Sequence, residues 1–580
     1  MLKEYRTLFP YMKKYASKYS AGLVCLVLVD AMQLLLPQLV RRAVDSIASG
    51  TFRIPGILLI ALQILVIAAS ISAGRYFWRL FIHGSSRRIE AELRERLFAH
   101  LLGLSGTFFR KNKTGDLMAR ATNDMGAVRQ AAGMGLVAFV DGAFMSTAIL
   151  AVMFARNPRV ALLTVTPLPA ITVLIVLFGM SIKKRFRAVQ EAYGKLSELV
   201  QETLSGIRVI QGFVQERFFG EQFARANEAY KGENMRLVVI FGLFFPLINF
   251  LAGLSLAILI FAGGNSVLSG RMSPGELVET ASYLEMLIWP MLGAGFTVNI
   301  LQRGAASLKR INEILDAESD ILSPAEPAAL ADAYPLEARN LSFRYPQANR
   351  DALRDVSFTL ERGKTLGIIG RTGSGKSTLL KLLPRLEDPP PRTVFLGGTD
   401  IRDLDLAALR RALGFVPQET FLFSDSIRAN VAYGNPRLDD GRLRAAEEIS
   451  AIDRDLAAFP AGEDTVVGER GLTLSGGQKQ RVSIARAIAA DSEILVLDDS
   501  LSAVDAETEE RILERVMRER AGRTTVIVSH RVSALRNADK ILVLEDGGLV
   551  QSGTHEELMA QADGIYAEIA RLQAYESGRA

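Results

Sequence analysis

Apolar positions divide the chain into two parts of different character. Six long apolar segments occupy the first part, at residues 21–40, 55–82, 131–155, 158–182, 236–268 and 274–301. Each is long enough to cross a hydrocarbon core of about 30 Å as a helix. Beyond residue 336 the apolar runs are short and rich in β-branched residues, and helical stretches separate them. The pattern predicts a membrane-spanning α-helical bundle followed by an α/β domain with buried parallel strands.

Length and composition agree with this division. The 580 residues are too many for one hydrophobic core, and 49% hydrophobic beside 23% charged residues favours a membrane part joined to a soluble part. Residues 316–336 are rich in Ala, Asp, Glu and Pro, which is typical of a surface linker. We therefore expect a transmembrane domain at 1–315, a linker at 316–336 and a soluble domain at 337–580.

The connectors between the apolar segments predict how the chain crosses the membrane. The long connectors, 83–130 and 183–235, are rich in Lys and Arg, whereas 156–157 and 269–273 are short. By the positive-inside rule the long connectors are cytoplasmic, and six crossings then place both ends of the chain in the cytoplasm. Three basic residues between the first two segments run against the rule but are outnumbered: Arg41, Arg42 and Arg53.

Both long connectors read as charged helices that extend the spans into the cytoplasm. Glycines interrupt the helical pattern at 113–116 and at 205–208. Two interpretations stay open there: short crosswise helices that press on a cytoplasmic domain, or ordinary loop turns.

The N-terminal residues predict a helix lying in the membrane interface, because Tyr5, Leu8, Phe9 and Met12 share one helical stripe. The apolar segment after it is interpreted as a retained span. It is long, carries a charge at Asp30 and lacks the small-residue cleavage site of a signal peptide. With no transit peptide, the expected location is a bacterial inner (plasma) membrane.

Charge and cysteine content narrow the function classes. A net charge of +5 is explained by cytoplasmic loops that face anionic lipid, so no nucleic-acid partner is expected. The single cysteine, Cys25, excludes an intrachain disulfide and a Cys-based metal site.

The strongest chemical motif is a phosphate-binding loop between an apolar strand and a helix. Its glycines let backbone N–H groups approach phosphates, and the helix N-terminus favours negative charge. Lys376 is expected to reach the β- and γ-phosphate oxygens of ATP, and Ser377 to bind Mg²⁺ together with Asp498 at the end of another strand. The predicted binding residues are Gly370, Arg371, Thr372, Gly373, Ser374, Gly375, Lys376, Ser377 and Thr378.

A second anion site is predicted where a hydroxyl and two glycine amides begin a helix, at Ser475, Gly476, Gly477 and Gln478. With an acidic strand end following it, this segment resembles the signature sequence of ATP-binding cassette (ABC) transporters. The resemblance covers nearly the whole chain and implies roles for other residues.

Three of these residues complete the nucleotide site that the resemblance implies. Tyr345 is expected to stack on adenine, Gln418 to reach Mg²⁺ and the attacking water, and His530 to act as the switch residue at the γ-phosphate. Asp505 resembles the loop that crosses between two nucleotide domains, and Glu469 resembles the residue that contacts the coupling helices.

The membrane half resembles the exporter subclass at 108–109, 114–117 and 206–208. The resemblance implies a half-transporter with six transmembrane helices and long intracellular helices, followed by one P-loop nucleotide-binding domain. Such chains work as dimers and use ATP with Mg²⁺.

The chain departs from the family at Asp499, where these transporters carry the Glu that polarises the hydrolytic water. Asp and Glu differ by only about 0.4 in intrinsic pKa, so basicity changes little. The side chain is shorter by one C–C bond of about 1.5 Å, and misplacing a catalytic group by about 1 Å can cost on the order of 100-fold in rate. We expect this site to bind ATP and to hydrolyse it slowly.

The run 497–505 resembles the degenerate-site subunits of bacterial heterodimeric multidrug exporters. In such dimers each ATP lies between one chain's phosphate loop and the other chain's signature. The expected partner is therefore a second half-transporter with Glu at the catalytic position, and the expected substrates are small amphipathic compounds. The alternatives are a lipid or peptide exporter of the same fold, a homodimeric exporter and a nucleotide-gated regulator that does not pump.

Charged residues within apolar segments are costly in hydrocarbon and are expected to face the bundle interior or a wet cavity: these are Asp30, Arg75, Asp141 and Glu285. Three roles are open for them: pairing between helices, an extracellular gate and binding of cationic compounds. Prolines predict kink points within the spans at Pro167, Pro169, Pro246 and Pro290.

Overall fold

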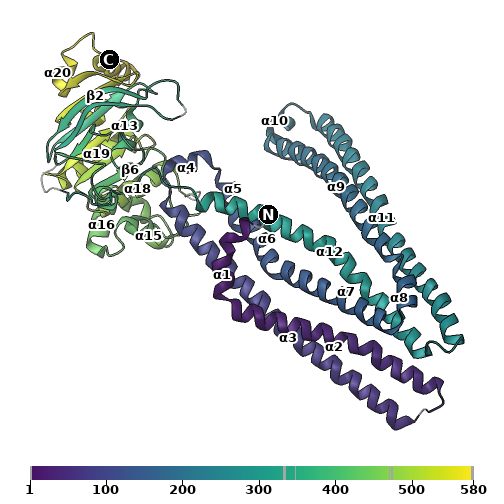
Figure 1. Cartoon of the computed structure of the whole chain (residues 1–580). Coiled ribbons are helices and arrows are strands. Elements are labelled where there is room, and N and C mark those ends of the chain that lie inside the picture. The colour runs from purple at the N-terminus through teal and green to yellow at the C-terminus, as the bar shows by residue number, and fades with distance from the viewer. Residues whose placement is uncertain are drawn as a thin grey trace. The chain divides into compact units, whose positions relative to one another are not determined.

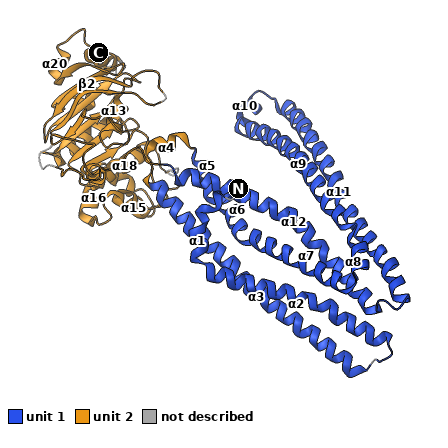
Figure 2. Ribbon diagram, viewed as in Figure 1, with its two compact units in different colours: residues 1–102, 113–317 blue, residues 103–112, 318–580 orange. Residues whose placement is uncertain are grey.

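A computed structural model describes residues 3–51, 53–330, 335–346, 348–468, 471 and 474–576. The chain forms long helices first and a mixed sheet with helices afterwards (Figure 1). It divides into two compact units, residues 1–102 with 113–317 and residues 103–112 with 318–580 (Figure 2).

Six helical segments of the first unit are long and apolar enough to cross a membrane, among the described residues, which confirms the predicted number. They are Ala16–Ala48, Ile54–Gly103, Thr114–Arg156, Pro158–Ser205, Glu216–Leu268 and Pro274–Leu315. The first, second, fifth and sixth are the single helices α2, α3, α11 and α12. The third ends in α7 (Leu136–Arg156), and the fourth consists of α8 (Pro158–Val165) and α9 (Leu168–Ser205).

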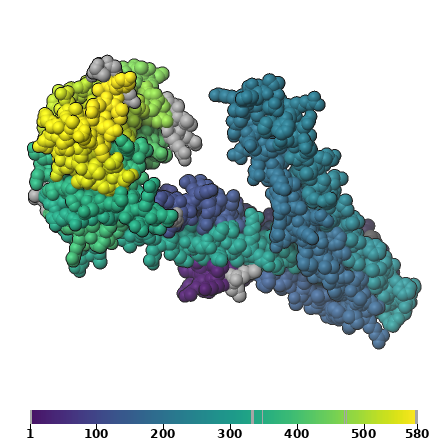
Figure 3. Space-filling model, turned by 90° about the horizontal axis from the view of Figure 1, so that it is seen from above, coloured from purple at the N-terminus to yellow at the C-terminus, as the bar shows by residue number. Residues whose placement is uncertain are grey.

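These helices are longer than a membrane requires. Helix α11 has 53 residues, so it is about 80 Å long, against a hydrocarbon core of about 30 Å. The charged connectors therefore continue the spans as helix, as expected. Helices α9 and α11 pair along their lengths and form one blue-teal column (Figure 1, Figure 3).

The N-terminal residues, predicted to form an interfacial helix, do not form one regular α-helix. They form a 3₁₀ helix, η1 (Glu4–Leu8), and then α1 (Phe9–Lys14). Leu8 is fully buried, whereas the Phe9 side chain is 70% exposed. The residues of the predicted stripe therefore differ in how far they are buried. The tighter 3₁₀ turn aligns residues three apart, so Tyr5 turns inward with Leu8 and donates a hydrogen bond to the Leu301 carbonyl at 2.8 Å.

Two short helices interrupt the long connectors, α4 (Gly106–Lys111) and α10 (Ile207–Gly212). The second lies where the glycine pattern predicts it. The first lies upstream of the predicted bend at 113–116, because Asn112 and Lys113 have extended backbones and make the turn. Gly115 instead lies in the first turn of α5 (Thr114–Ala119).

The described residues of the second unit form a ten-stranded sheet in the order β5-β4-β1-β2-β10-β9-β3-β8-β7-β6. Strands β9, β3, β8, β7 and β6 are parallel neighbours, as predicted. The antiparallel part, which pairs β1 with β2 and β4, was not predicted. The bounds are β1 Leu336–Phe343, β2 Leu353–Leu360, β3 Thr365–Gly370, β4 Val394–Leu396, β5 Thr399–Asp400, β6 Leu413–Val416, β7 Ile494–Asp498, β8 Thr524–Val528, β9 Lys540–Glu545 and β10 Gly548–Gly553.

The central strands β3, β7 and β8 are buried throughout. Alternate residues enter different hydrophobic clusters: Leu366 and Ile368 join one, and Ile369 joins the other. Because successive side chains of a strand point to opposite faces, the two clusters cover the two faces of the sheet. This rigid core holds the strand ends that carry the candidate site.

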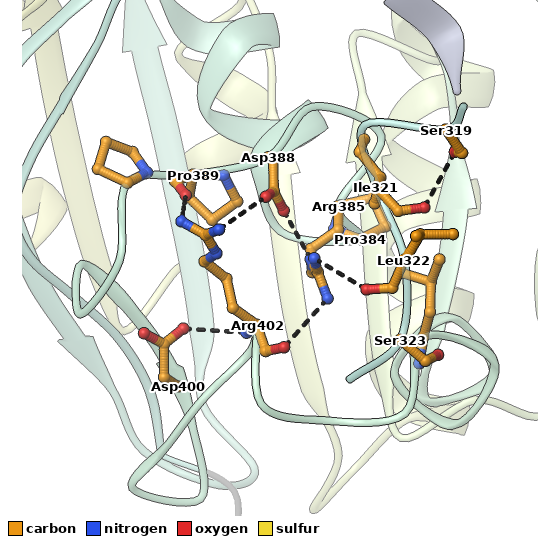
Figure 4. Close-up of polar contacts among 12 residues, drawn as sticks. Ser319, Ile321, Leu322, Ser323, Pro384, Arg385, Asp388, Pro389, Asp400 and Arg402 are labelled. Carbon is orange, nitrogen blue, oxygen red and sulfur yellow. Dashed lines mark hydrogen bonds and ion pairs between the residues drawn. The ribbon is translucent and has the colours of Figure 1, made fainter. Parts of the chain in front are cut away.

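The segment between α12 and β1 is in part buried, although the sequence predicts a surface linker. Ile321 is buried, and Leu322 accepts a hydrogen bond from Arg385 at 3.4 Å (Figure 4). Arg385 is itself 3% exposed and donates to Asp388 at 2.8 Å and to the Arg402 carbonyl at 3.4 Å. Residues 319–323 belong to the second unit and are anchored to the rest of it through the buried guanidinium of Arg385.

Candidate nucleotide site

The predicted phosphate loop connects buried strand β3 to helix α13 (Lys376–Leu382). Gly373 and Gly375 have φ values of +83° and +96°, which L-residues with side chains avoid. A Cβ at Gly375 would also lie 2.5 Å from the Ala352 carbonyl oxygen, whereas one at Gly373 would meet nothing within 4 Å. Position 375 therefore requires glycine for two independent reasons, its positive φ and the steric clash that a Cβ would make.

Lys376 lies folded against this loop. Its Nζ donates hydrogen bonds to the Gly370 and Arg371 carbonyls at 2.8 and 2.9 Å, and the side chain is buried. Burial lowers the pKa of Lys376, while the nearby Asp499 and Asp498 carboxylates act in the opposite direction. The ammonium is thus held between the loop and two acidic groups.

The side chains of Ser377 and Asp498 form a hydrogen bond, although β8 separates β3, which precedes Ser377, from β7, which ends at Asp498. The Ser377 hydroxyl donates to Asp498 Oδ1 at 3.2 Å, and Asp498 is only 3% exposed. Burial raises the pKa of Asp498, and the neighbouring Asp499 raises it further. A hydroxyl and a carboxylate are oxygen ligands that Mg²⁺ accepts, so the pair fits the expected cation.

Four parallel strands bring the remaining predicted residues to one edge. Strands β3, β8, β7 and β6 are neighbours, and their registers align their carboxyl ends: Ile368 pairs with Val528, Val528 with Asp498, and Val416 with Leu497. Each strand end carries a predicted residue: Gly370 on β3, His530 beyond β8, Asp498 and Asp499 at β7, and Gln418 beyond β6. The side chain of Gln418 is exposed at this edge.

Asp499 has an unusual backbone. Its φ is +44°, a left-handed conformation that Asp tolerates better than most residues with side chains. Its N–H donates to the Val528 carbonyl at 2.9 Å, which ties it to the end of β8. The carboxylate lies near Asp498 and Lys376, and this backbone fixes the direction in which the short side chain points.

Two residues near Asp499 were missed by the sequence reasoning. Glu509, on α19 (Ala506–Glu519), is 4% exposed and forms an ion pair with Arg531. Burial raises the pKa of Glu509, while Arg531 acts in the opposite direction. Arg531 also donates to the Val504 carbonyl at 3.3 Å, so it joins the segment of His530 to that of Asp505. The only signal available was an Arg next to His530.

Tyr345 lies close to the phosphate-loop helix. Its hydroxyl donates to Thr378 Oγ1 at 3.3 Å, and the Arg110 guanidinium lies 5.7 Å from the ring centroid. Arg110, from α4, also binds both carboxylate oxygens of buried Glu387, with 3.0 Å for the Nη2–Oε2 contact. The sequence did not predict this pairing, because nothing local joins α4 to residue 387.

The signature residues form a separate group. Ser475 caps α18 (Gly476–Ala489) and accepts from the Gln478 N–H at 3.3 Å, while Gln478 Oε1 accepts from the Ser475 N–H. Gln478 also donates to Asp455 at 2.9 Å. In the part of the chain that the structure describes, none of these contacts reaches the phosphate loop. A Cβ at Gly477 would lie 3.1 Å from the Ala503 carbonyl oxygen, so the glycine allows a close approach.

The family resemblance also implies roles for Asp505 and Glu469, and the structure describes only Asp505. Asp505 caps α19 by accepting from the Thr508 N–H at 2.9 Å, and this hydrogen bond lowers the pKa of its carboxyl. Glu469 lies outside the described residues.

Comparison with known families assigns both parts of the chain. Residues 19–291 match the ABC transporter transmembrane region, and residues 353–502 match the ABC transporter domain. A solved structure titled "Structure of a bacterial Atm1-family ABC exporter with ATP bound" superimposes with a TM-score of 0.80 at 27% identity, covering 96% of this chain and 99% of that one.

Several curated relatives are similar over nearly their full length. "Probable multidrug resistance ABC transporter ATP-binding/permease protein YheI" of Bacillus subtilis (strain 168) is 40% identical over 96% of this chain and 95% of the relative. "Multidrug resistance-like ATP-binding protein MdlA" of Escherichia coli (strain K12) is 36% identical over 98% and 96%. "ATP-dependent lipid A-core flippase" of Syntrophus aciditrophicus (strain SB) is 33% identical over 98% and 94%.

Proposed function

This chain belongs to the ABC transporter family and is an ATPase-coupled transporter of the exporter fold, and we propose that it is one subunit of a heterodimeric exporter. It moves amphipathic compounds out of the cytoplasm by alternating access. The observation that carries the proposal is Asp499: its shortened carboxylate follows Asp498 at the end of β7, while the signature at Ser475 is complete.

The phosphate loop binds ATP through its backbone N–H groups at the start of α13. Lys376 turns from the Gly370 and Arg371 carbonyls to the β- and γ-phosphate oxygens. Tyr345, positioned by its bond to Thr378, stacks on the adenine ring.

Three residues of this edge would hold Mg²⁺: Ser377, Asp498 and Gln418. The cation would supply positive charge that offsets the negative charge of the phosphates. Ser377 and Asp498 are already within hydrogen-bonding distance, so they need little rearrangement to converge on one cation. His530 donates to the γ-phosphate, and Asp499 orients the attacking water and accepts its proton.

Asp499 makes this site slow. Its backbone is tied to Val528, so the strand end does not advance to compensate for a shorter side chain. A shortfall of about 1 Å in the position of a catalytic base costs on the order of 100-fold in rate.

ABC exporters act as dimers, and the separation of the signature from the phosphate loop gives this chain a second role. Its Ser475, Gly476, Gly477 and Gln478 complete the ATP site of the partner. Two copies of this chain would build two slow sites, so the proposed partner is a half-transporter with Glu at the catalytic position. Hydrolysis at the partner's site then resets the transporter.

The proposed location is the bacterial inner membrane with both chain ends in the cytoplasm. The support is the charge distribution: the two long connectors carry most of the Lys and Arg between the spans and outnumber the basic residues Arg41, Arg42 and Arg53 on the other side.

The rate of ATP hydrolysis tests the proposal. The purified chain alone is expected to bind ATP and to hydrolyse it slowly, and Asp499→Glu is expected to raise its rate by about 10- to 100-fold. A matched control is Asp563→Asn, which removes an exposed carboxylate outside the site. A wild-type rate that Asp499→Glu does not raise would contradict the slow site.

The dimer is tested separately. Co-expression with a half-transporter that carries Glu at the catalytic position is expected to give a stable pair. A pair whose partner carries Gln in place of this Glu is expected to lose most of its ATPase activity. Equal losses from that variant and from Asp499→Asn would indicate two equivalent sites and contradict the heterodimer.

A second candidate is a lipid exporter, which the 33% identity to a lipid A-core flippase favours. Transport in proteoliposomes discriminates between the candidates. A fluorescent phospholipid that changes leaflet on addition of ATP supports the lipid exporter, and ATP-driven accumulation of a small amphipathic dye supports the multidrug exporter.

A further inference from the structure

The charged residues within the spans form two groups. Arg75 on α3 donates to Gln33 at 3.2 Å, and Gln33 donates to Asp30 on α2 at 3.4 Å. Asp141 on α7 lies within hydrogen-bonding reach of Asp30. These three charges therefore interact across helices. Glu285 on α12 is different: among the described residues, none forms an ion pair or hydrogen bond with its side chain.

Glu285 lines a cavity of about 360 Å³ within the first unit. The cavity lies between α9, α11 and α12, and its wall is mostly apolar. Its large apolar side chains are Leu168, Leu256, Leu284 and Ile288. This volume and composition match a small-molecule site, in which apolar walls surround a few polar groups.

Ser255, on the α11 side of the cavity, supplies a second polar group. It is 1% exposed, and its hydroxyl has no hydrogen-bond partner among the described residues. Serines in apolar helices ordinarily bond to a carbonyl one turn earlier, as Ser282 does with Val278 at 3.0 Å. A buried hydroxyl without a partner is costly, so a ligand that accepts its hydrogen bond would be stabilised there.

Small residues make the space. The wall includes Ala252, Gly253 and Ala281, and a Cβ at Gly253 would meet nothing within 4 Å. The helix therefore accepts a side chain at Gly253 without a clash, and that side chain would enter open space.

The depth of Glu285 makes its charge significant. It lies 11 residues after Pro274, so it is about 16 Å along α12, near the middle of a hydrocarbon core of about 30 Å. An unpaired carboxylate at that depth is costly and is commonly functional. A cation that also carries apolar surface would satisfy both the charge and the walls.

We propose that this cavity is a binding site for a small amphipathic cation, whose charge pairs with Glu285 while its apolar body packs between α9, α11 and α12. The proposal deepens the proposed export function and rests on it for the role of the ligand as cargo. The Ser255 hydroxyl is available to ligands that carry an acceptor, and binding of the cation does not depend on it.

Two ions of equal size and opposite charge test it. Tetraphenylphosphonium and tetraphenylborate binding is measured by equilibrium dialysis on the full-length chain with its partner in detergent, against protein-free micelles. The cation is expected to bind saturably and the anion is not. Glu285→Gln is expected to weaken cation binding at least about tenfold, and Gly253→Leu is expected to weaken it by filling the cavity.

Glu202→Gln is the matched control, because it removes an exposed carboxylate of α9 outside the cavity. It is expected to bind the cation like the wild type. Equal binding by Glu285→Gln and wild type, or equal binding of both ions, overturns the proposal. An absence of saturable cation binding also overturns it, and indicates that a partner side chain or lipid covers the cavity. Dialysis needs no ATP, so these results are independent of the ATPase tests of the proposed function.

Discussion

The Ser377 hydroxyl and the Asp498 carboxylate, 121 positions apart in the chain, meet at 3.2 Å. Ser377 lies in the first turn of α13, which follows β3, and Asp498 ends β7, with β8 between the two strands. The parallel register aligns the carboxyl ends of these strands, so the two side-chain oxygens reach the same point.

Asp498→Asn is expected to abolish most Mg²⁺-dependent nucleotide binding, because a neutral amide is a poor ligand for a hard cation. The measurement is the Kd of a fluorescent ATP analogue with Mg²⁺ and with EDTA. We expect the Mg²⁺-dependent gain to fall at least about tenfold in the variant. Asp563→Asn, an exposed carboxylate outside the site, serves as the control. An unchanged Mg²⁺ response would contradict the assigned ligand.

Gly375→Ala and Gly373→Ala separate backbone strain from steric clash. Both positions have positive φ, which costs Ala about 1–2 kcal/mol. Only at Gly375 does the new Cβ also meet a carbonyl oxygen, at 2.5 Å. We expect both variants to bind the ATP analogue more weakly, and Gly375→Ala to lose more than Gly373→Ala. Equal losses of affinity for the ATP analogue in the two variants would show that backbone strain alone explains the effect, with no contribution from the clash at Gly375.

Arg110→Ala is expected to loosen α4 from the rest of the second unit, to which α4 belongs. The guanidinium binds both oxygens of Glu387, which is 6% exposed, and lies over the Tyr345 ring. Because Arg110 is itself half exposed, we expect a coupling energy of about 1–2 kcal/mol in a double-mutant cycle with Glu387→Gln. Lys111→Ala, an exposed neighbour on α4, is the control. Additive effects of the two substitutions would contradict the pairing.

Glu447→Gln is expected to stabilise α16 (Asp440–Ile449) at neutral pH and to have little effect near pH 4.5. Burial, followed by the nearby Glu463, raises the pKa of Glu447 to about 7 from 4.5. The folded state therefore binds an extra proton between about pH 4.5 and 7, and wild-type stability falls as pH rises through that window. The advantage of the variant should grow over the same window and stay constant above it.

Hydrogen exchange of the α16 amides at pH 5 and pH 8 measures this effect. Glu448→Gln is the matched control, because its side chain is the exposed neighbour on the same helix. A stabilisation that is equal at the two pH values would contradict the raised pKa.

Local patterns were sufficient for much of the fold. Six apolar segments, the glycine-rich loop before Lys376 and the cap at Ser475 each depend on residues close in sequence, and the corresponding helices and loops form where expected. The first predicted bend, at 113–116, lies at the N-terminal edge of that range, because extended backbones at Asn112 and Lys113 make the turn and Gly115 does not.

The sequence by itself therefore determined the elements that local chemistry specifies: the membrane helices, the parallel strands, the phosphate loop and the short carboxylate of Asp499. Only the tertiary structure decided the contacts between distant residues: the antiparallel strands, the Arg110–Glu387 pair, and the distinction between the interacting Asp30 and Glu285, which is unpaired among the described residues. The physical reason is that helix periodicity and glycine content are properties of adjacent residues. Pairing and burial depend instead on which segments the fold brings together.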